Sequence, residues 1–490
     1  MSTPAPNVTL NLVDRTTAVP DVVSGIAFVQ GITERGPVND PGRLIFSWPQ
    51  FLMLHGGYIP ESDFPLHCKM MLERGVVLRI NGIKKNAVRA TANIENISNQ
   101  TLFTLQSKYP GESYNEMDVT IQDPSDSELG DFNMLIEFND GEYSERYENL
   151  KADEDSINTA LARSSWVELE SMDVYVEGVD PDLDPKKETV SFTDGADGDT
   201  VEDVDFNDFS AFDEYEDTYF LGAPGWDGDL QAHCLAGEAY AASRKDLRFY
   251  ASIETDHDVN NMISHREDLP YSRWISYSSG GWQILDPVTG NKKEVSELSH
   301  FIANGVNVTK DQNPWTSFSG PENLVPNVLK PLVNYGGKAK FAELDMLNRN
   351  HINMAINRNG VNMFWGNFTA QRENSHTKFI STNNLIIFMN KSLAPVLETF
   401  IERPLDIPLF RTIFYTIKPY LDRLVVPGRA IFNYDYKGDQ NANSLDELKI
   451  NDPNDIQDGK YKVILSITRI NPLQDFELTI ELTRAGVTIQ

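Results

Sequence analysis

Among the residues that could do chemistry, the most suggestive group is in residues 226–234, WDGDLQAHC. Asp229 and His233 are four positions apart at the expected start of a helix, and Cys234 follows directly. A hydrolytic triad needs a histidine between a nucleophile and an orienting acid. Neighbouring helix residues point about 100° apart, so Cys234 is badly placed for His233. The chain has no Gly-x-Ser-x-Gly element, and we expect Asp229 near the helix N-terminus and His233 on the next turn, with structural roles.

A second group of reactive side chains is the acidic run at residues 194–205, DGADGDTVEDVD. Alternating carboxylates suit calcium, but this run lacks the glycine and the terminal glutamate of an EF-hand loop. A solvated linker is the favoured interpretation. Zinc-ligand spacing, a P-loop and a dinucleotide-binding glycine set are all absent from the sequence. The sequence therefore predicts no catalytic group, no metal site and no cofactor.

Basic residues gather in and near two expected helices at about 382–401 and 405–424. The plain interpretation is solvent-facing charge. The functional interpretation is a surface that meets an acidic partner, and its candidates are Lys391, Arg403, Arg411, Lys418 and Arg423.

The net charge of −31 is concentrated in one segment. Residues 111–217 hold 34 acidic and 5 basic residues, a balance of −29, so the remainder sums to −2. An acidic surface repels DNA and anionic membranes, and no apolar run is long enough to span a bilayer. We expect neither direct nucleic-acid binding nor membrane insertion. The first ten residues do not resemble a signal peptide, and the two cysteines, Cys68 and Cys234, fit a reducing cytoplasm.

The elements that must position these groups change character along the chain. Residues 1–22 are proline-containing and are expected to form an extended arm. Strand, helix and strand patterns at 25–30, 65–73 and 76–80 indicate a mostly parallel sheet. Short alternating strands dominate from about 93 to 199, and helix and strand alternation resumes in 200–347. We interpret 23–92 and 200–347 as one α/β domain that a β-rich insertion interrupts, followed by a C-terminal domain at 348–490.

Both ends of the chain carry strand patterns with a period of two. The apolar positions are Val8, Leu10 and Leu12 at one end and Phe476, Leu478, Ile480 and Leu482 at the other. An unpaired strand edge is a template for one more strand. The two patterns could pair within one chain or with other copies of the chain.

A series of short motifs resembles the contractile-tail sheath proteins of bacteriophages and related particles. In chain order they are GIAFVQGITERGPVNDPGRLIFSWPQFLMLHGG (25–57), residues 65–80, KYPGESYN (108–115), DPVTG (286–290), residues 299–307, NPWTSFSG (313–320) and residues 348–365. Each is short, and their order over some 340 residues carries the resemblance. One departure is that Trp365-Gly366 continues with Asn367-Phe368-Thr369, where the family often has Ala-Arg-Thr.

The resemblance implies a multidomain α/β plus β fold. Its parts would be a subtilisin-like α/β domain that is not a protease, a β-sandwich-like insertion, an α+β C-terminal sheath domain facing a tube, and extended terminal arms. It implies that subunits polymerise helically around a tail tube and contract, driving the tube through a host envelope. The implied partners are other copies of the chain, the tail tube protein, and baseplate and tail terminator proteins. The implied location is the virion tail sheath, made in the host bacterial cytoplasm.

Three alternatives follow from the same residues. The chain could be the sheath of a phage-derived, tailocin-like injection particle rather than of a phage. It could be a hydrolase built on the α/β domain, with His233 in its site. It could also be a monomeric binding module that uses the insertion to bind its partner.

Overall fold

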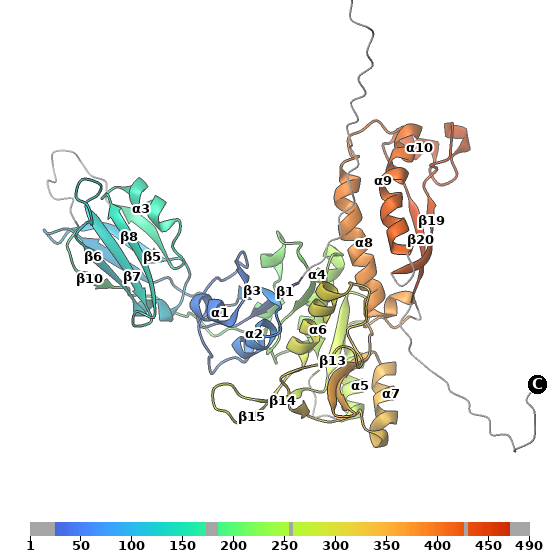
Figure 1. Cartoon of the computed structure of the whole chain (residues 1–490), viewed down its shortest axis with the longest axis horizontal. Coiled ribbons are helices and arrows are strands. Elements are labelled where there is room, and N and C mark those ends of the chain that lie inside the picture. Colours follow the sequence, from blue (N-terminus) through green and yellow to red (C-terminus); the bar gives the residue numbers. More distant parts are fainter. Residues whose placement is uncertain (1–24, 173–184, 254–257, 374, 426–429, 471–490) are drawn as a thin grey trace, which may run out of the picture. The chain divides into compact units, whose positions relative to one another are not determined.

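The computed structural model describes residues 25–172, 185–253, 258–373, 375–425 and 430–470. They divide into two compact units (Figure 1). The α/β unit contains Phe318–Asn383 and the described part of Val23–Pro314. The C-terminal unit contains Trp315–Ser317 and the described part of Asn384–Gln490. The apolar patterns predicted at both chain ends, including Val8, Leu10, Leu12, Phe476, Leu478, Ile480 and Leu482, lie outside the described residues.

An eight-stranded sheet forms the centre of the α/β unit. Its strands, in sheet order, are β18 (Val361–Trp365), β17 (Ile352–Arg358), β13 (Ile275–Ser279), β12 (Arg248–Ser252), β11 (Thr218–Gly222), β1 (Ile26–Gly31), β3 (Val77–Gly82) and β2 (Leu44–Ile45). The six inner strands are parallel, and the two edge strands pair antiparallel. The predicted mostly parallel sheet is confirmed, and its apolar runs are buried on both faces as parallel sheets require.

Helices cover both faces of this sheet at close range (Figure 1). Phe249 of β12 pairs with Leu221, whereas Phe220 of β11 pairs with Arg248, so the two phenylalanines point to opposite faces. A side chain at Gly237 of α4 (Leu230–Arg244) would lie 2.5 Å from the Phe249 ring. One at Gly305 of α6 (Leu298–Asp311) would lie 2.3 Å from the Phe220 ring. Glycine at these two positions therefore allows both helices to pack close to the sheet, because a side chain there would collide with the ring.

Other elements of the α/β unit complete its layers and edges. They are α1 (Trp48–His55), α2 (Phe64–Leu72), α5 (Val259–Asp268), α7 (Phe341–Arg349) and the three-stranded sheet β15-β14-β16, with strands Lys292–Val295, Trp282–Leu285 and Lys330–Pro331. The helix predicted at 65–73 is confirmed as α2, and the helix expected to start near Asp229 is confirmed as α4.

Two further sheets between residues 91 and 191 share one buried core. The first has the order β10 (Thr189–Ser191), β6 (Met117–Gln122), β7 (Phe132–Phe138), β8 (Tyr143–Leu150), and the second β4 (Thr91–Glu95), β5 (Thr101–Ser107), β9 (Val167–Met172), with helix α3 (Glu154–Leu161) beside them. Between β7 and β8, Asn139 and Asp140 have φ of 56° and 53°. This left-handed pair is typical of a tight hairpin turn.

Residue 348, where the sequence predicts the start of a C-terminal domain, is followed by two strands of the α/β unit. Strands β17 and β18 belong to the large sheet, where Ile352 pairs with Tyr277 of β13. The main part of the C-terminal unit begins at Asn384, within α8 (Ile380–Glu398). It continues with α9 (Ile407–Val425), β19 (Ile431–Lys437), α10 (Pro453–Gln457) and β20 (Ile464–Arg469). A fully buried strand cannot be assigned to a sheet from its own residues, because its parallel partner is far away in sequence.

A two-stranded neck joins the β-rich segment to the rest of the α/β unit. Val88 and Ala196 exchange backbone hydrogen bonds, as do Thr91 and Thr193. The acidic carboxylates at 194–205 are mostly exposed, as a solvated linker predicts, but the backbone is paired. Lys84 forms an ion pair with Asp197, and Lys85 pairs with two further carboxylates of the run. The first part of this solvated linker is therefore also paired through its backbone with residues 85–91.

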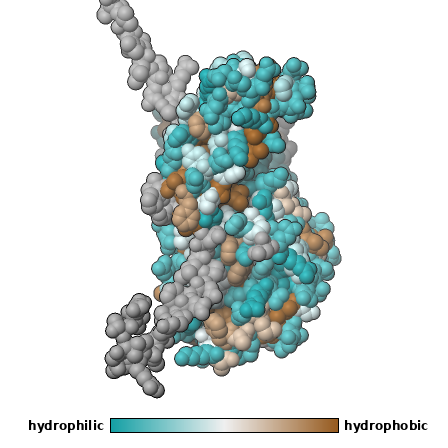
Figure 2. All heavy atoms as spheres, turned by 90° about the vertical axis from the view of Figure 1, so that its right-hand side faces the viewer, coloured by the Kyte–Doolittle hydropathy of each residue, from teal (hydrophilic) through white to brown (hydrophobic). Residues whose placement is uncertain are grey.

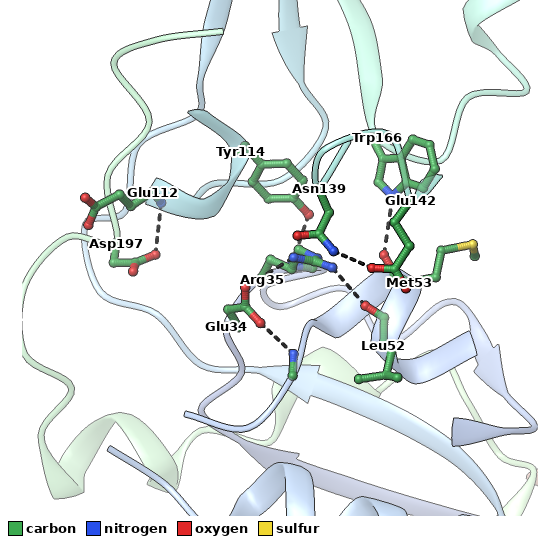
Figure 3. Close-up of polar contacts among 12 residues, drawn as sticks. Glu34, Arg35, Leu52, Met53, Glu112, Tyr114, Asn139, Glu142, Trp166 and Asp197 are labelled. Atoms are coloured by element: carbon green, nitrogen blue, oxygen red, sulfur yellow. Dashed lines mark hydrogen bonds and ion pairs between the residues drawn. The ribbon is translucent and has the colours of Figure 1, made fainter. Parts of the chain in front are cut away.

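A second set of contacts, around Arg35, joins the β-rich segment to the rest of the α/β unit (Figure 3). Its Nη2 donates to the carbonyl of Leu52 at 3.0 Å, and its guanidinium lies 4.4 Å from the centre of the Phe138 ring. The next residue, Gly36, donates its N–H to the Tyr114 hydroxyl at 3.1 Å, and Trp166 Nε1 donates to the Met53 carbonyl at 3.4 Å (Figure 3). Arg35 is almost fully buried, and these contacts, with its ion pair to Glu34, offset the cost of burying its charge.

Replacing Arg35 by alanine should lower the free energy of unfolding by about 3 kcal/mol, because a charged hydrogen bond and a buried cation–π contact are lost together. Urea unfolding measures the change. Arg146→Ala is the matched control, because Arg146 is half exposed and forms a surface ion pair with Glu148, so its loss should cost less than about 1 kcal/mol. Equal effects of the two substitutions would contradict the role given to Arg35.

Candidate functional site

The structure places Asp229, His233 and Cys234 as the sequence predicts. Asp229 caps α4, and its Oδ1 accepts from the N–H groups of Gln231 and Ala232 at 3.1 and 3.3 Å. His233 lies on the next turn, buried against the Trp226 ring at 4.2 Å between centroids. Burial lowers the pKa of His233 to about 4 and raises the pKa of Cys234 to about 12. Neither group has the protonation behaviour of a base or a thiolate nucleophile near pH 7.

One histidine–serine pair escaped the sequence analysis. His67 Nδ1 of α2 lies 2.9 Å from Ser299 Oγ at the start of α6. Ser299 is fully buried, and burial lowers the pKa of His67 to about 4. A buried hydroxyl cannot reach a substrate, so this pair bonds two helices rather than forming a nucleophile. Nothing local in the sequence could have indicated it, since the two residues are 232 positions apart.

A polar cavity of about 270 Å³ lies beside this pair, where β12 and β13 end. Ligands of open α/β sheets bind at such strand ends. Glu297 is buried there and is already satisfied, because it accepts from Ser252 Oγ at 2.9 Å and from the Gly281 N–H at 3.0 Å. Within the described residues, no group of three or more His, Cys, Asp or Glu side chains could hold a metal ion. The same part of the chain contains no helix long and apolar enough to cross a membrane.

The five basic candidates occupy different positions around the helix pair. Lys391 lies in α8 and Arg403 in the turn after it, where its guanidinium is 5.0 Å from the Phe400 ring centre. The other three, Arg411, Lys418 and Arg423, lie on α9. Its buried side consists of Phe410, Ile413, Ile417, Tyr420, Leu421 and Leu424.

The opposite side of α9 carries charge and one exposed aromatic ring. Arg411, Tyr415 and Lys418 follow one another at helical spacing, and Tyr415 is 66% exposed. Arg411 donates to the Ala442 carbonyl and Asn443 Oδ1, and Lys418 pairs with Asp422 at 2.5 Å. Figure 2 shows one face of the molecule, on which apolar residues lie in small groups among polar ones. The structure thus brings Arg411 and Lys418 together on one stripe and leaves Lys391 and Arg403 on other segments.

The small sheet of the C-terminal unit has only two strands. β19 and β20 pair antiparallel from Ile431–Arg469 to Lys437–Ile464. Among the described residues no third strand joins them, and Phe432 on β19 is 67% exposed. A two-stranded ladder is marginal by itself, and its outer edges can accept further strands.

Comparison with known structures shows which fold these units form. The sheath tail protein of Listeria innocua matches with a TM-score of 0.60 at 10% identity, over 91% of this chain and 95% of that one. The helical sheath of the anti-feeding prophage in its contracted state matches with a TM-score of 0.59 at 11% identity, over 98% and 99%. The sheath tail protein of Desulfitobacterium hafniense gives 0.54 at 13%, over 88% and 91%.

The chain has the contractile-sheath fold. At 10–13% identity the likeness is one of fold, and it extends over nearly the full length of both chains. No protein-family model and no characterised protein sequence matches the chain. The sheath fold combines mixed α/β layers and several sheets, which agrees with the predicted α/β plus β class.

Lowering the pH should destabilise the folded protein through its buried histidines. His233 stays neutral in the fold down to about pH 4, whereas it binds a proton below about pH 6.5 when unfolded. Its contribution to stability is therefore complete above pH 6.5 and is lost as the pH falls from 6.5 toward 4. Between pH 7 and 5, His233→Gln should reduce the loss of unfolding free energy by about 1–2 kcal/mol. Urea unfolding at both pH values measures this, and His265→Gln, an exposed histidine, is the control.

Proposed function

We propose that this chain is the structural subunit of a contractile tail sheath. The observation that carries the proposal is the sheath fold over 98% of this chain and 99% of the anti-feeding prophage sheath. A likeness of that extent involves every described unit rather than one common domain. The proposed subunit polymerises helically around a tail tube and contracts, driving the tube through the host envelope. Its partners are other copies, the tube protein, and baseplate and terminator proteins, and its location is the virion tail after synthesis in the bacterial cytoplasm.

The proposed role is mechanical rather than enzymatic. The α/β unit is proposed to be subtilisin-like, with its catalytic positions taken over by packing. The buried His67–Ser299 pair and the buried His233 support this, because each stabilises contacts between elements of the fold. The acidic segment, taken as the outer domain at 93–199 with its linker, supplies a hydrated and negatively charged exterior that opposes non-specific association.

The proposed links between subunits are strands from the terminal arms. The candidates are Val8, Leu10 and Leu12 in one arm and Phe476, Leu478, Ile480 and Leu482 in the other. Their acceptor would be the β19–β20 ladder of a neighbouring copy, whose outer edges have no described partner. Twenty extended residues reach about 65 Å, which suffices to cross to a neighbour. Main-chain pairing through flexible arms also survives a large rotation of rigid units.

The proposed tube-facing surface is the exposed side of α9. Arg411, Lys418 and Arg423 give it positive charge, and Tyr415 supplies an exposed aromatic ring. Aromatic and arginine side chains are enriched at protein interfaces. Lys391 and Arg403 extend this candidate surface from α8 and the turn that follows it.

A second candidate within the same class is a phage-derived injection particle. The anti-feeding prophage sheath and the sheath of an extracellular contractile injection system share the fold over 98% of this chain. Genes beside the coding sequence distinguish the two, since only a phage requires a capsid and DNA-packaging proteins.

Electron microscopy of the purified full-length chain tests the proposal. We expect hollow tubes with a helical repeat, formed by the protein alone or after co-expression with its tube protein. Deleting residues 1–20 should leave a folded, soluble protein that forms no tubes, because the strand donated to the neighbour is lost. Monomers under both conditions would overturn the sheath function, whereas tubes from the deletion variant would overturn only the arm pairing.

Charge reversal on α9 should separate tube binding from sheath assembly. The double variant Lys418→Glu, Arg423→Glu should form sheath tubes normally but co-purify with the tube protein at least about tenfold less, since like charges now face an acidic tube. Lys460→Glu is the control, because Lys460 is exposed in the same unit but lies outside α9. If both variants retained the tube protein equally, α9 would not be the tube-facing surface.

A further inference from the structure

The end of β20 is held by a side chain as well as by its strand partner. Arg469 is the last residue of β20 and pairs with Ile431 at one end of the β19–β20 ladder. The N–H of Ile470 donates to the Ala430 carbonyl at 3.4 Å. Ile470 is the last described residue, so residues 471–490 follow in the sequence directly after this end of the ladder.

The guanidinium of Arg469 bridges two main-chain carbonyls from distant parts of the sequence. Nη1 donates to the Ala430 carbonyl at 2.9 Å, and Nη2 donates to the Trp315 carbonyl at 2.8 Å. Burial lowers the pKa of Arg469 to about 10, so the group stays charged at neutral pH. Hydrogen bonds from a charged donor are about twice as strong as neutral ones.

Trp315 is fixed by buried aromatic packing rather than by a strand. Its ring meets Phe388 of α8 edge-on, with centroids 5.3 Å apart, and Phe388 stacks on Tyr420 of α9 at 6.1 Å. All three rings are buried. The carbonyl that Arg469 binds thus belongs to a residue anchored in the helix pair, outside the β19–β20 ladder.

We propose that Arg469 is a positioning residue that anchors the root of the C-terminal arm to the helix pair through Trp315. The inference rests on the proposed sheath function, in which a neighbour holds the arm. Tension on the arm reaches the ladder first at the Ile431–Arg469 pair, and a ladder loaded at one end opens pair by pair from that end. The bond to Trp315 transfers this load to α8 and α9, because it connects the last pair to residues that the ladder does not contain.

Hydrogen exchange on the free full-length chain tests the anchor without assembly. In Arg469→Ala the Ile470 amide should exchange about tenfold faster, equivalent to about 1.4 kcal/mol of lost protection. Amides near the Lys437–Ile464 end should be unchanged. Lys437→Ala removes a positive charge at that opposite end of the same ladder and should leave the Ile470 amide as in the wild type. Arg469→Lys keeps the charge but cannot span both carbonyls as the guanidinium fork does. The Ile470 amide of this variant should therefore exchange at a rate between those of Arg469→Ala and the wild type.

Preformed tubes supply the second readout. Tubes of Arg469→Ala should dissolve at a lower urea concentration than wild-type tubes, and this shift should exceed the shift in the unfolding midpoint of the free subunits. Unchanged Ile470 exchange, or equal resistance of all tubes, would overturn the anchor. If Arg469→Ala fails to fold, the Ile470 exchange rate and the urea resistance of tubes are measured on Arg469→Lys instead, and these two results test the anchor. A wild-type chain that forms no tubes refutes the sheath function instead, and the exchange result is independent of that outcome.

Discussion

Backbone groups that leave water must find hydrogen-bond partners, and the sheets of this chain meet that requirement in different ways. The eight-stranded sheet satisfies its inner strands completely and ends in short antiparallel strands, of which β2 has only two residues. The β19–β20 ladder has outer edges with no described strand partner. The large sheet therefore ends in short edge strands, whereas the outer edges of the small one can accept further strands. The proposed assembly uses this difference, because the arms would add strands to the small sheet.

Buried arginines supply a second kind of connection throughout a chain of net charge −31. Arg35 binds the Leu52 carbonyl, Arg266 binds the Ala370 carbonyl, and Arg469 binds the Ala430 and Trp315 carbonyls. Each of these bonds goes to an uncharged carbonyl oxygen, and Arg35 also forms an ion pair with Glu34. Each guanidinium joins segments that are distant in sequence, which makes each unit resistant to local deformation. Such units suit a sheath in which subunits move as rigid bodies.

The polar residues near the ends of β12 and β13 take part in packing contacts within the α/β unit. His67, Ser299 and Glu297 have the side-chain types of an active site, but each is buried and bonded to a neighbour. The serine hydroxyl is inaccessible, and burial keeps the imidazole of His67 neutral. Their hydrogen bonds connect α2, α6 and the ends of the sheet, which is a structural contribution.

Local elements were determined by the sequence itself. Apolar patterns predicted β1, α2, β3 and the α8–α9 pair, and Asp229 marked the expected start of α4, because a carboxylate can accept hydrogen bonds from the free N–H groups there. Composition located the acidic segment, and ordered motifs indicated the sheath fold. The arm strands and the division into domains stay predictions, as do the contacts of the basic candidates with a tube.

Only the tertiary structure decided which distant segments meet. The place of β17 in the large sheet, the pairing of 194–199 with 85–91, and the contacts of Arg35 and Arg469 all join residues that no local pattern relates. A strand buried on both faces looks the same whichever parallel partner it takes. An arginine likewise has the same appearance in sequence whether it is solvated or bonded to a carbonyl 154 positions away. Periodicity reports which side of an element is buried, whereas the partner on that side is set by how the whole chain packs.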